Sequence, residues 1–183
     1  MKIVSKLATA VTALTIATAA YAENPMVGGA PMFENKNIVE NAVNSADHTT
    51  LVAAVKAAGL VETLQSPGPF TVFAPVNDAF AALPDDTVDT LLKPENKDML
   101  TKVLTAHVVA GDWSAGEIAR QARASSDGFY HFNAVSGDAL SAQVRGNNVF
   151  IYDESGNAGR VTIADVDQSN GVIHVVDTVL VPK

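Results

Sequence analysis

The chain has 183 residues, no cysteine, and 20 acidic against 12 basic residues, which gives a formal net charge of −8. The absence of cysteine excludes disulfide scaffolds, thiolate metal sites and thiol catalysis, so the core must be built from packing alone. The negative charge, with no basic cluster to oppose it locally, excludes direct binding of nucleic acid phosphates.

Residues 1–22 have the layout of a secretory signal peptide. Lys2 and Lys6 make the start positive, an apolar stretch follows, and Ala20-Tyr21-Ala22 provides small residues around a cleavage point. A membrane anchor is the alternative, but the apolar stretch is shorter than the roughly 20 residues of a spanning helix. The pattern therefore predicts a periplasmic or secreted chain with no transmembrane segment.

Residues 23–36 are expected to form an extended arm rather than a helix or strand, because they contain two adjacent glycines and two prolines. The apolar residues of this arm indicate that part of it packs on the domain; they are Met26, Val27, Met32 and Phe33. The domain itself is expected to span residues 37–183, which is within the usual size of a single domain.

Helical patterns dominate the first half of the domain. Asp47 is expected to cap the first helix, Asn77 or Asp78 the third, and Ser114 with Glu117 forms a capping-box pattern for the last. A short strand is expected over 70–74. The expected helices span residues 48–58, 61–64, 77–83, 84–92, 95–105 and 114–123.

From residue 129 onward the pattern changes to strands. Apolar and polar residues alternate over 140–145, which is typical of a half-buried strand. Turn sequences separate it from further strands, which are expected over 148–153, 159–166 and 172–182. Helices followed by antiparallel strands predict an α+β fold rather than a series of β-α-β units.

Three segments resemble signature blocks of the fasciclin domain family, in the family's order and spacing. They are Thr-Val-Phe-Ala-Pro-Val-Asn-Asp-Ala-Phe (71–80), Ala-His-Val-Val (106–109), and Asn-Gly-Val-Ile-His-Val-Val-Asp-Thr-Val-Leu-Val-Pro (170–182). The chain is similar to a bacterial secreted member with a single domain. The resemblance implies a wedge of antiparallel or mixed β-sheets flanked by several short helices.

The resemblance also implies a non-catalytic role in adhesion or in binding a protein or glycan at the cell envelope. In animal members, the middle block and the end of the last block are linked to integrin binding. This implies partner contacts at His107, Val108, Asp177 and Thr178. The middle block normally carries Tyr before His, whereas Ala106 stands here, so integrin binding itself is not expected. A buried hydrogen-bonding role for His107 is the competing interpretation.

A carrier of apolar small molecules is the second interpretation, because some algal members of the family bind carotenoids. The residues expected to line such a groove are Met26, Val27, Met32, Phe33 and Trp113. The alternative is that the arm only covers the core.

No motif of a known catalytic or cofactor-binding class is recognisable. The sequence contains no G-x-S-x-G, H-E-x-x-H, P-loop or G-x-G-x-x-G pattern. None of the histidines falls at metal-ligand spacing from another; they are His48, His107, His131 and His174. The sequence therefore predicts a protein without enzymatic activity, cofactor or metal.

Overall fold

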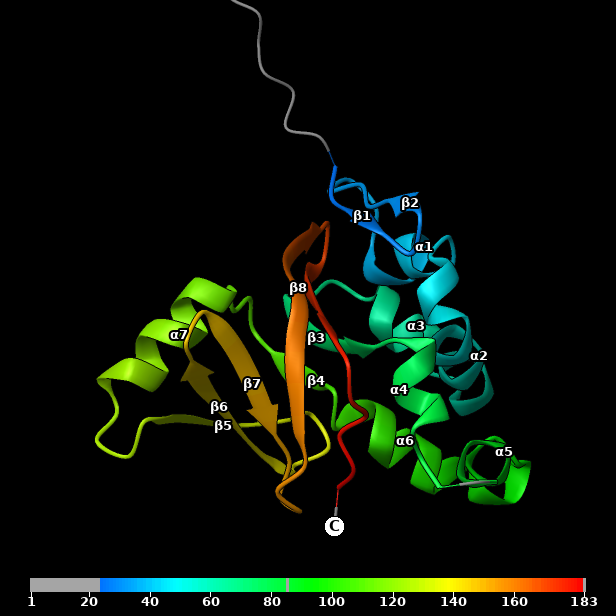
Figure 1. Cartoon of the computed structure of the whole chain (residues 1–183). Coiled ribbons are helices and arrows are strands. Elements are labelled where there is room, and N and C mark those ends of the chain that lie inside the picture. The colour runs from blue at the N-terminus through cyan, green and yellow to red at the C-terminus, as the bar shows by residue number, and fades with distance from the viewer. Residues whose placement is uncertain (1–23, 85, 183) are drawn as a thin grey trace, which may run out of the picture.

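The computed structural model describes residues 24–84 and 86–182, and its centre is a sheet of seven strands (Figure 1). The strands are β3 (Phe70–Pro75), β4 (Val108–Ala110), β5 (Phe129–Asn133), β6 (Ala139–Arg145), β7 (Asn148–Tyr152), β8 (Ala158–Gln168) and β9 (Gly171–Val176). Their order is β4-β3-β9-β8-β7-β6-β5; β3 and β9 run parallel and the other neighbours run antiparallel. The predicted signal peptide lies outside the described residues.

Short helices flank the sheet on two sides. They are α1 (Ile38–Ala42), α2 (Thr49–Ala58), α3 (Val61–Gln65), α4 (Asn77–Ala81), α5 (Thr87–Leu91), α6 (Lys97–Thr105) and α7 (Ala115–Ala124), with 3-10 turns η1 (Ala46–His48) and η2 (Pro94–Asn96). Figure 1 shows α1 to α6 on one side of β3 and β8, and α7 on the other side with β5, β6 and β7. The predicted α+β wedge is confirmed.

Strands β3 and β9 are buried on both faces. Because side chains alternate across a strand, Val72 and Val175 pack with helices α1 to α6, whereas Phe73 and Val176 pack with α7 and strands β5 to β7. The two hydrophobic clusters therefore share the same two strands and belong to one domain.

The N-terminal arm is a hairpin, so the expectation of an irregular extended segment was wrong. Strands β1 (Met26–Val27) and β2 (Ala30–Pro31) pair antiparallel. Gly28 and Gly29 form the turn with φ of +57° and +75°, a conformation that favours glycine. Val27 and Met32 are buried in the larger cluster, so the hairpin packs on the domain.

Helix α2 is capped by a residue from a distant element, not by Asp47. Residues 46–48 form the turn η1, which leaves His48 at the N-cap position without a side-chain cap. The Oδ1 atom of Asn77 accepts hydrogen bonds from Thr50 N at 3.0 Å and Thr49 Oγ1 at 3.1 Å. Asn77 is therefore the first residue of α4 and the capping residue of α2.

The last strand ends at Val176, six residues earlier than expected. Beyond it, one backbone bond to β8 remains, from Asp177 N to the Arg160 carbonyl at 3.2 Å, and side chains supply the further partners. Asp177 Oδ1 accepts from Arg160 N at 2.8 Å, and Leu180 N and Val181 N donate to His107 Nε2 and Asp153 Oδ2, both at 2.9 Å. Residues 177–182 thus form a tail that side chains hold in place.

Asn170 and Gly171 join three elements at the turn before β9. The buried Asn170 carboxamide accepts from Ile38 N at 3.0 Å and donates to the carbonyls of Leu64 at 2.7 Å and Ser66 at 3.0 Å. A Cβ atom at Gly171 would lie 1.9 Å from the carbonyl oxygen of Phe70. The pair therefore fixes α1 and α3 against the start of β3.

We expect Asn170→Ala to lower the free energy of unfolding by about 2–4 kcal/mol, because it removes three hydrogen bonds, two of them buried, and leaves their backbone partners unpaired. Urea denaturation measures this loss. Asn147→Ala, at an exposed turn, is the matched control and should stay within about 0.5 kcal/mol of the wild type. Equal stabilities of the two variants would contradict the role of Asn170.

Candidate functional site

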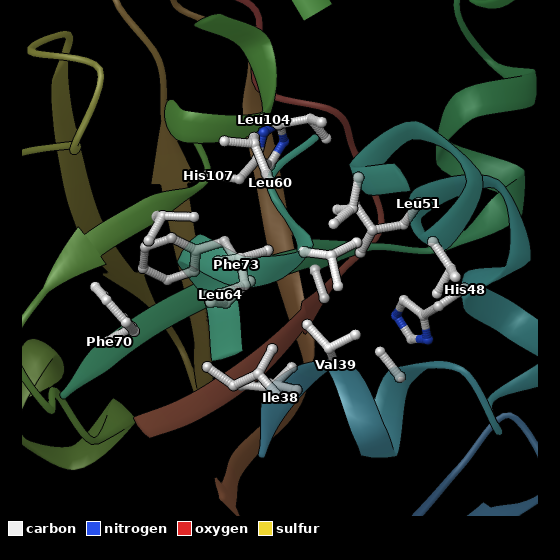
Figure 2. A pocket seen from close by; sticks show the side chains of 18 of the residues that line it. Ile38, Val39, His48, Leu51, Leu60, Leu64, Phe70, Phe73, Leu104 and His107 are labelled. Atoms are coloured by element: carbon white, nitrogen blue, oxygen red, sulfur yellow. The ribbon is translucent and has the colours of Figure 1, made fainter. Parts of the chain in front are cut away.

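An apolar cavity of about 80 Å³ lies within the larger hydrophobic cluster, between the helices and the sheet (Figure 2). Its walls are almost entirely apolar, and they come from the N-terminal arm, from α1, η1, α2, α3 and α6, and from strands β3, β4, β8 and β9. Residues labelled in Figure 2 include Ile38, Val39, Leu51, Leu60, Leu64, Phe70, Phe73 and Leu104. Lys56, Thr63 and Val135 also line the cavity and are exposed, so it reaches the surface there.

His48 brings a polar group into this apolar wall. Its side chain is buried, and Nδ1 lies 2.8 Å from Ser45 Oγ. Nε2 has no hydrogen-bond partner of normal geometry among the described residues. Burial lowers the pKa of His48, against smaller opposing effects of the Ala74 carbonyl and Asp47. The imidazole is therefore neutral at pH 7.

Only some of the residues predicted to line an apolar groove lie at the cavity. Val27 and Met32 reach the cavity. Met26 is 58% exposed, because alternation along β1 turns it away from the core. Phe33 is outside the lining and lies under the Lys36 ammonium group, 4.8 Å from its ring centroid. The prediction was wrong for these last two residues.

Trp113 also lies away from the cavity. It packs against Tyr130, with ring centroids 5.7 Å apart, at the edge of the smaller cluster. Its indole Nε1 donates to the carbonyl of Ala110 at 3.1 Å, and its backbone N donates to Thr71 Oγ1 at 2.9 Å. Its expected role in the same groove as the arm was therefore wrong, because the central sheet separates the two clusters.

His107 and Val108 are inside the domain, so direct contact with a partner was the wrong expectation for them. His107 is 2% exposed and Val108 is 6% exposed. His107 Nε2 accepts from Leu180 N, so Nδ1 carries the proton and donates to the carbonyl of Val103 at 2.8 Å. The histidine thereby attaches the C-terminal tail to α6. This is the buried hydrogen-bonding role that was the competing interpretation for His107.

Asp177 and Thr178 lie nearer to solvent at the end of β9. Asp177 is exposed and Thr178 is half-buried. The Asp177 carboxylate also lies near the Arg160 guanidinium, with 3.4 Å between Oδ2 and Nε. Of the four predicted contact residues, these two remain available to a partner.

Aromatic and planar polar side chains gather on one face of β5, β6 and β7. Phe129, Gln143 and Phe150 are neighbours across the strands. The Arg145 guanidinium lies 5.7 Å from the centroid of Phe150 and 5.6 Å from that of Tyr152. These five side chains, called the aromatic face below, are outside both described core clusters.

The opposite side of the same strands packs inward, with Leu140, Ala142 and Ile151 buried against α7. The aromatic face was not predicted from the sequence. The available signal was the alternation over 148–152, where Phe150 and Tyr152 flank the buried Ile151.

Metal-ligating clusters and membrane-spanning helices are both absent from the described residues. Between residues 24 and 182, residue 85 aside, no group of three or more His, Asp or Glu residues is arranged to hold a metal ion. In the same ranges, no helix has the length and apolar character needed to cross a membrane.

The model of the Fasciclin domain matches residues 46–182, most of the chain. This chain belongs to the fasciclin domain family. It is 51% identical over 145 residues to the protein sll1483 of Synechocystis sp., with 79% of this chain and 73% of that protein covered. It is 34% identical to the immunogenic protein MPB70 of Mycobacterium bovis, with 77% and 66% covered.

A solved structure supports the same assignment of the fold. The FAS1 domain pair from the insect cell adhesion molecule fasciclin I matches with a TM-score of 0.69 and 16% identity. The match covers 79% of this chain and half of the length of that structure. The fold of this fasciclin domain is therefore the FAS1 fold.

We expect acid to destabilise this fasciclin domain through His107. Burial lowers the pKa of His107 from 6.5 to about 4, so the unfolded chain binds more protons between these two values. The contribution of His107 to the free energy of unfolding is fully present above pH 6.5. It falls by about 3 kcal/mol as the pH drops to 4. Urea denaturation at several pH values in this range measures the slope of the free energy of unfolding against pH.

The variant His107→Gln should be less stable at pH 7 and should lose less stability between pH 7 and 4. Asn147→Gln, at an exposed turn, should keep the wild-type slope. A slope that His107→Gln leaves unchanged would show that other groups cause the acid sensitivity.

Proposed function

We propose that this fasciclin domain is an exported, non-catalytic binding module that engages a glycan at the cell envelope through the aromatic face. The observation that carries the proposal is the gathering of Phe129, Phe150 and Tyr152 with Gln143 and Arg145 on one side of the sheet. Export follows from the signal pattern at residues 1–22, and the family includes a cell adhesion molecule.

The chemistry of this face suits a sugar. Aromatic rings pack against the C–H faces of pyranose rings, and planar amide and guanidinium groups bond the hydroxyl groups around them. Arg145 Nε donates to Gln143 Oε1 at 2.7 Å, which holds the guanidinium over the rings before any ligand binds. Such pre-organisation lowers the entropic cost of binding.

The charge of the face favours an acidic glycan. Arg145 on β6 supplies the positive charge of the face, whereas Arg160 on β8, the cross-strand neighbour of Phe150, is balanced by Asp177. The Arg145 cation stands on a chain with a net charge of −8. Carboxylate or sulfate groups on a glycan would be attracted to this region and repelled by the rest of the surface.

We expect Tyr152→Ala and Arg145→Ala each to weaken binding of uronic acid oligosaccharides about tenfold, because each removes a stacking surface or a charge-assisted hydrogen bond. Isothermal titration calorimetry measures the affinity, with neutral oligosaccharides as the comparison. Met99→Ala removes an exposed apolar side chain from α6 and should leave the affinity unchanged.

Failure of the wild type to bind either acidic or neutral oligosaccharides would end the glycan proposal. A photocrosslinker at position 152 that captures an envelope protein would then identify the partner as a protein.

A second candidate function is that of a carrier of an apolar small molecule, and the cavity favours it. Its volume of about 80 Å³ is roughly half that of an engineered lysozyme cavity of about 150 Å³ that takes up benzene. A carotenoid-like molecule would have to extend through the opening near Lys56, Thr63 and Val135 or displace the walls. A smaller apolar molecule fits the present shape better.

We expect the protein purified from its native host to carry an extractable apolar molecule, and Val39→Phe to reduce the amount, because the larger ring fills the cavity. Mass spectrometry of the solvent extract measures the load. Val43→Phe is the matched control, since Val43 at the end of α1 is 48% exposed. The carrier function would be contradicted if no apolar molecule could be extracted, or if Val39→Phe and Val43→Phe carried equal amounts of it.

A further inference from the structure

A histidine borders the aromatic face. His131 lies on β5, and the register of the sheet places it in one row with Ser141 on β6 and Tyr152 on β7. Phe129 lies two residues earlier on the same side of β5, and its ring stacks on the imidazole, with centroids 6.1 Å apart and 26° between the planes. Because Phe129 also meets Tyr152 edge-on at 5.6 Å, the imidazole is continuous with the proposed glycan surface.

An aspartate from the loop between α7 and β5 holds this imidazole in place (Figure 1). Asp127 Oδ2 lies 2.9 Å from His131 Nε2. The carboxylate is itself fixed, because its Oδ1 accepts hydrogen bonds from Ser125 Oγ at 2.6 Å and from Phe129 N at 3.0 Å. The hydrogen bond from His131, followed by those from Ser125 and Phe129, holds the pKa of Asp127 well below its usual range. Asp127 is therefore ionised throughout the pH range in which a histidine titrates.

This arrangement decides which nitrogen changes when the imidazole gains a proton. A neutral imidazole carries one N–H group, and the neighbouring carboxylate requires this group to be at Nε2. Nδ1 is then a bare acceptor, and it has no hydrogen-bond partner among the described residues. The side chain of His131 is 63% exposed. Protonation therefore places a new N–H donor at Nδ1, where a ligand can reach it.

The charge beside the aromatic face changes in the same step. With a neutral imidazole the pair carries the negative charge of Asp127, and with an imidazolium its two charges cancel. The other titratable or charged groups around this row are Tyr152, Arg145 at the end of β6, and Glu154, whose carboxylate bonds the first residue of β6. Helix α7 packs on the opposite face of β5. Phenols, guanidinium groups and carboxylates ordinarily keep their charge between about pH 5 and 8, so His131 is the group that changes.

We propose that His131 and Asp127 form a proton-dependent subsite of the glycan surface, which accepts a carboxylate or sulfate group of the ligand when His131 is protonated. This inference rests on the glycan-binding function proposed above and adds its regulation by pH. Next to a neutral imidazole, an anionic group meets the charge of Asp127 and the lone pair of Nδ1, so it is repelled. Next to an imidazolium, the same group accepts a charge-assisted hydrogen bond. Binding of an acidic glycan therefore takes up a proton, and its affinity rises as the pH falls.

An oligogalacturonate and its uncharged methyl ester test the proposal as a matched pair, since they differ only in the charge of the carboxyl groups. We expect the affinity of the wild type for the oligogalacturonate, measured by isothermal titration calorimetry, to rise about three- to tenfold from about pH 8 to about pH 5.5. The affinity for the methyl ester should not change with pH.

Three variants separate the roles of the two residues. His131→Gln should abolish the rise in affinity, whereas Asn147→Gln, at an exposed turn, should keep it. Asp127→Asn should bind the oligogalacturonate more tightly than the wild type at about pH 8, because it removes the repelling charge.

Proton uptake provides a second readout. Titrations at about pH 7 in two buffers of different ionisation enthalpy should show that the wild type takes up protons when it binds the oligogalacturonate, and that His131→Gln does not. If neither oligosaccharide binds, the glycan function fails and the subsite fails with it. If both bind but the wild type shows no pH dependence and no proton uptake, or His131→Gln keeps both, the glycan function stands and the role of His131 is overturned.

Discussion

The close approach of Asn170-Gly171 to the start of β3 is the constraint on which the rest of this domain depends. It places the last strand parallel to β3 and, through one carboxamide, fastens α1 and α3 to the same point. Because these helices are held by directed hydrogen bonds at their ends, their apolar sides need not fill all the space against the sheet. The cavity is the space that remains between them.

The two proposed sites follow from the two sides of one sheet. Strands β3 and β9 are covered on both faces, so their only accessible space is internal and apolar. Strands β5 to β7 are covered by α7 on one face, which leaves Phe150 and Tyr152 on the other. An enclosed ligand and a surface partner therefore occupy separate regions and need not compete.

The local pattern of the amino-acid sequence predicted much of the fold. Strand alternation, glycine turns and three motif blocks led to the α+β wedge and to the correct family. The predictions were wrong where a contact between residues far apart in the sequence determines the local structure. Asn77 caps α2 across 27 residues of sequence, and His107 bonds Leu180 across 73. The placement of Trp113 and the cavity beside His48 likewise depend on tertiary packing, which sequence spacing does not reveal.

The position of β9 has a consequence for biosynthesis. This strand lies in the interior of the sheet, between β3 and β8, and its parallel register joins Gly171 to Phe70. Strand β3 therefore cannot complete its pairing until the whole segment from β3 to β9 has been synthesised. Until then, the edge of β3 that later pairs with β9 stays open, and an open apolar strand edge is prone to aggregation.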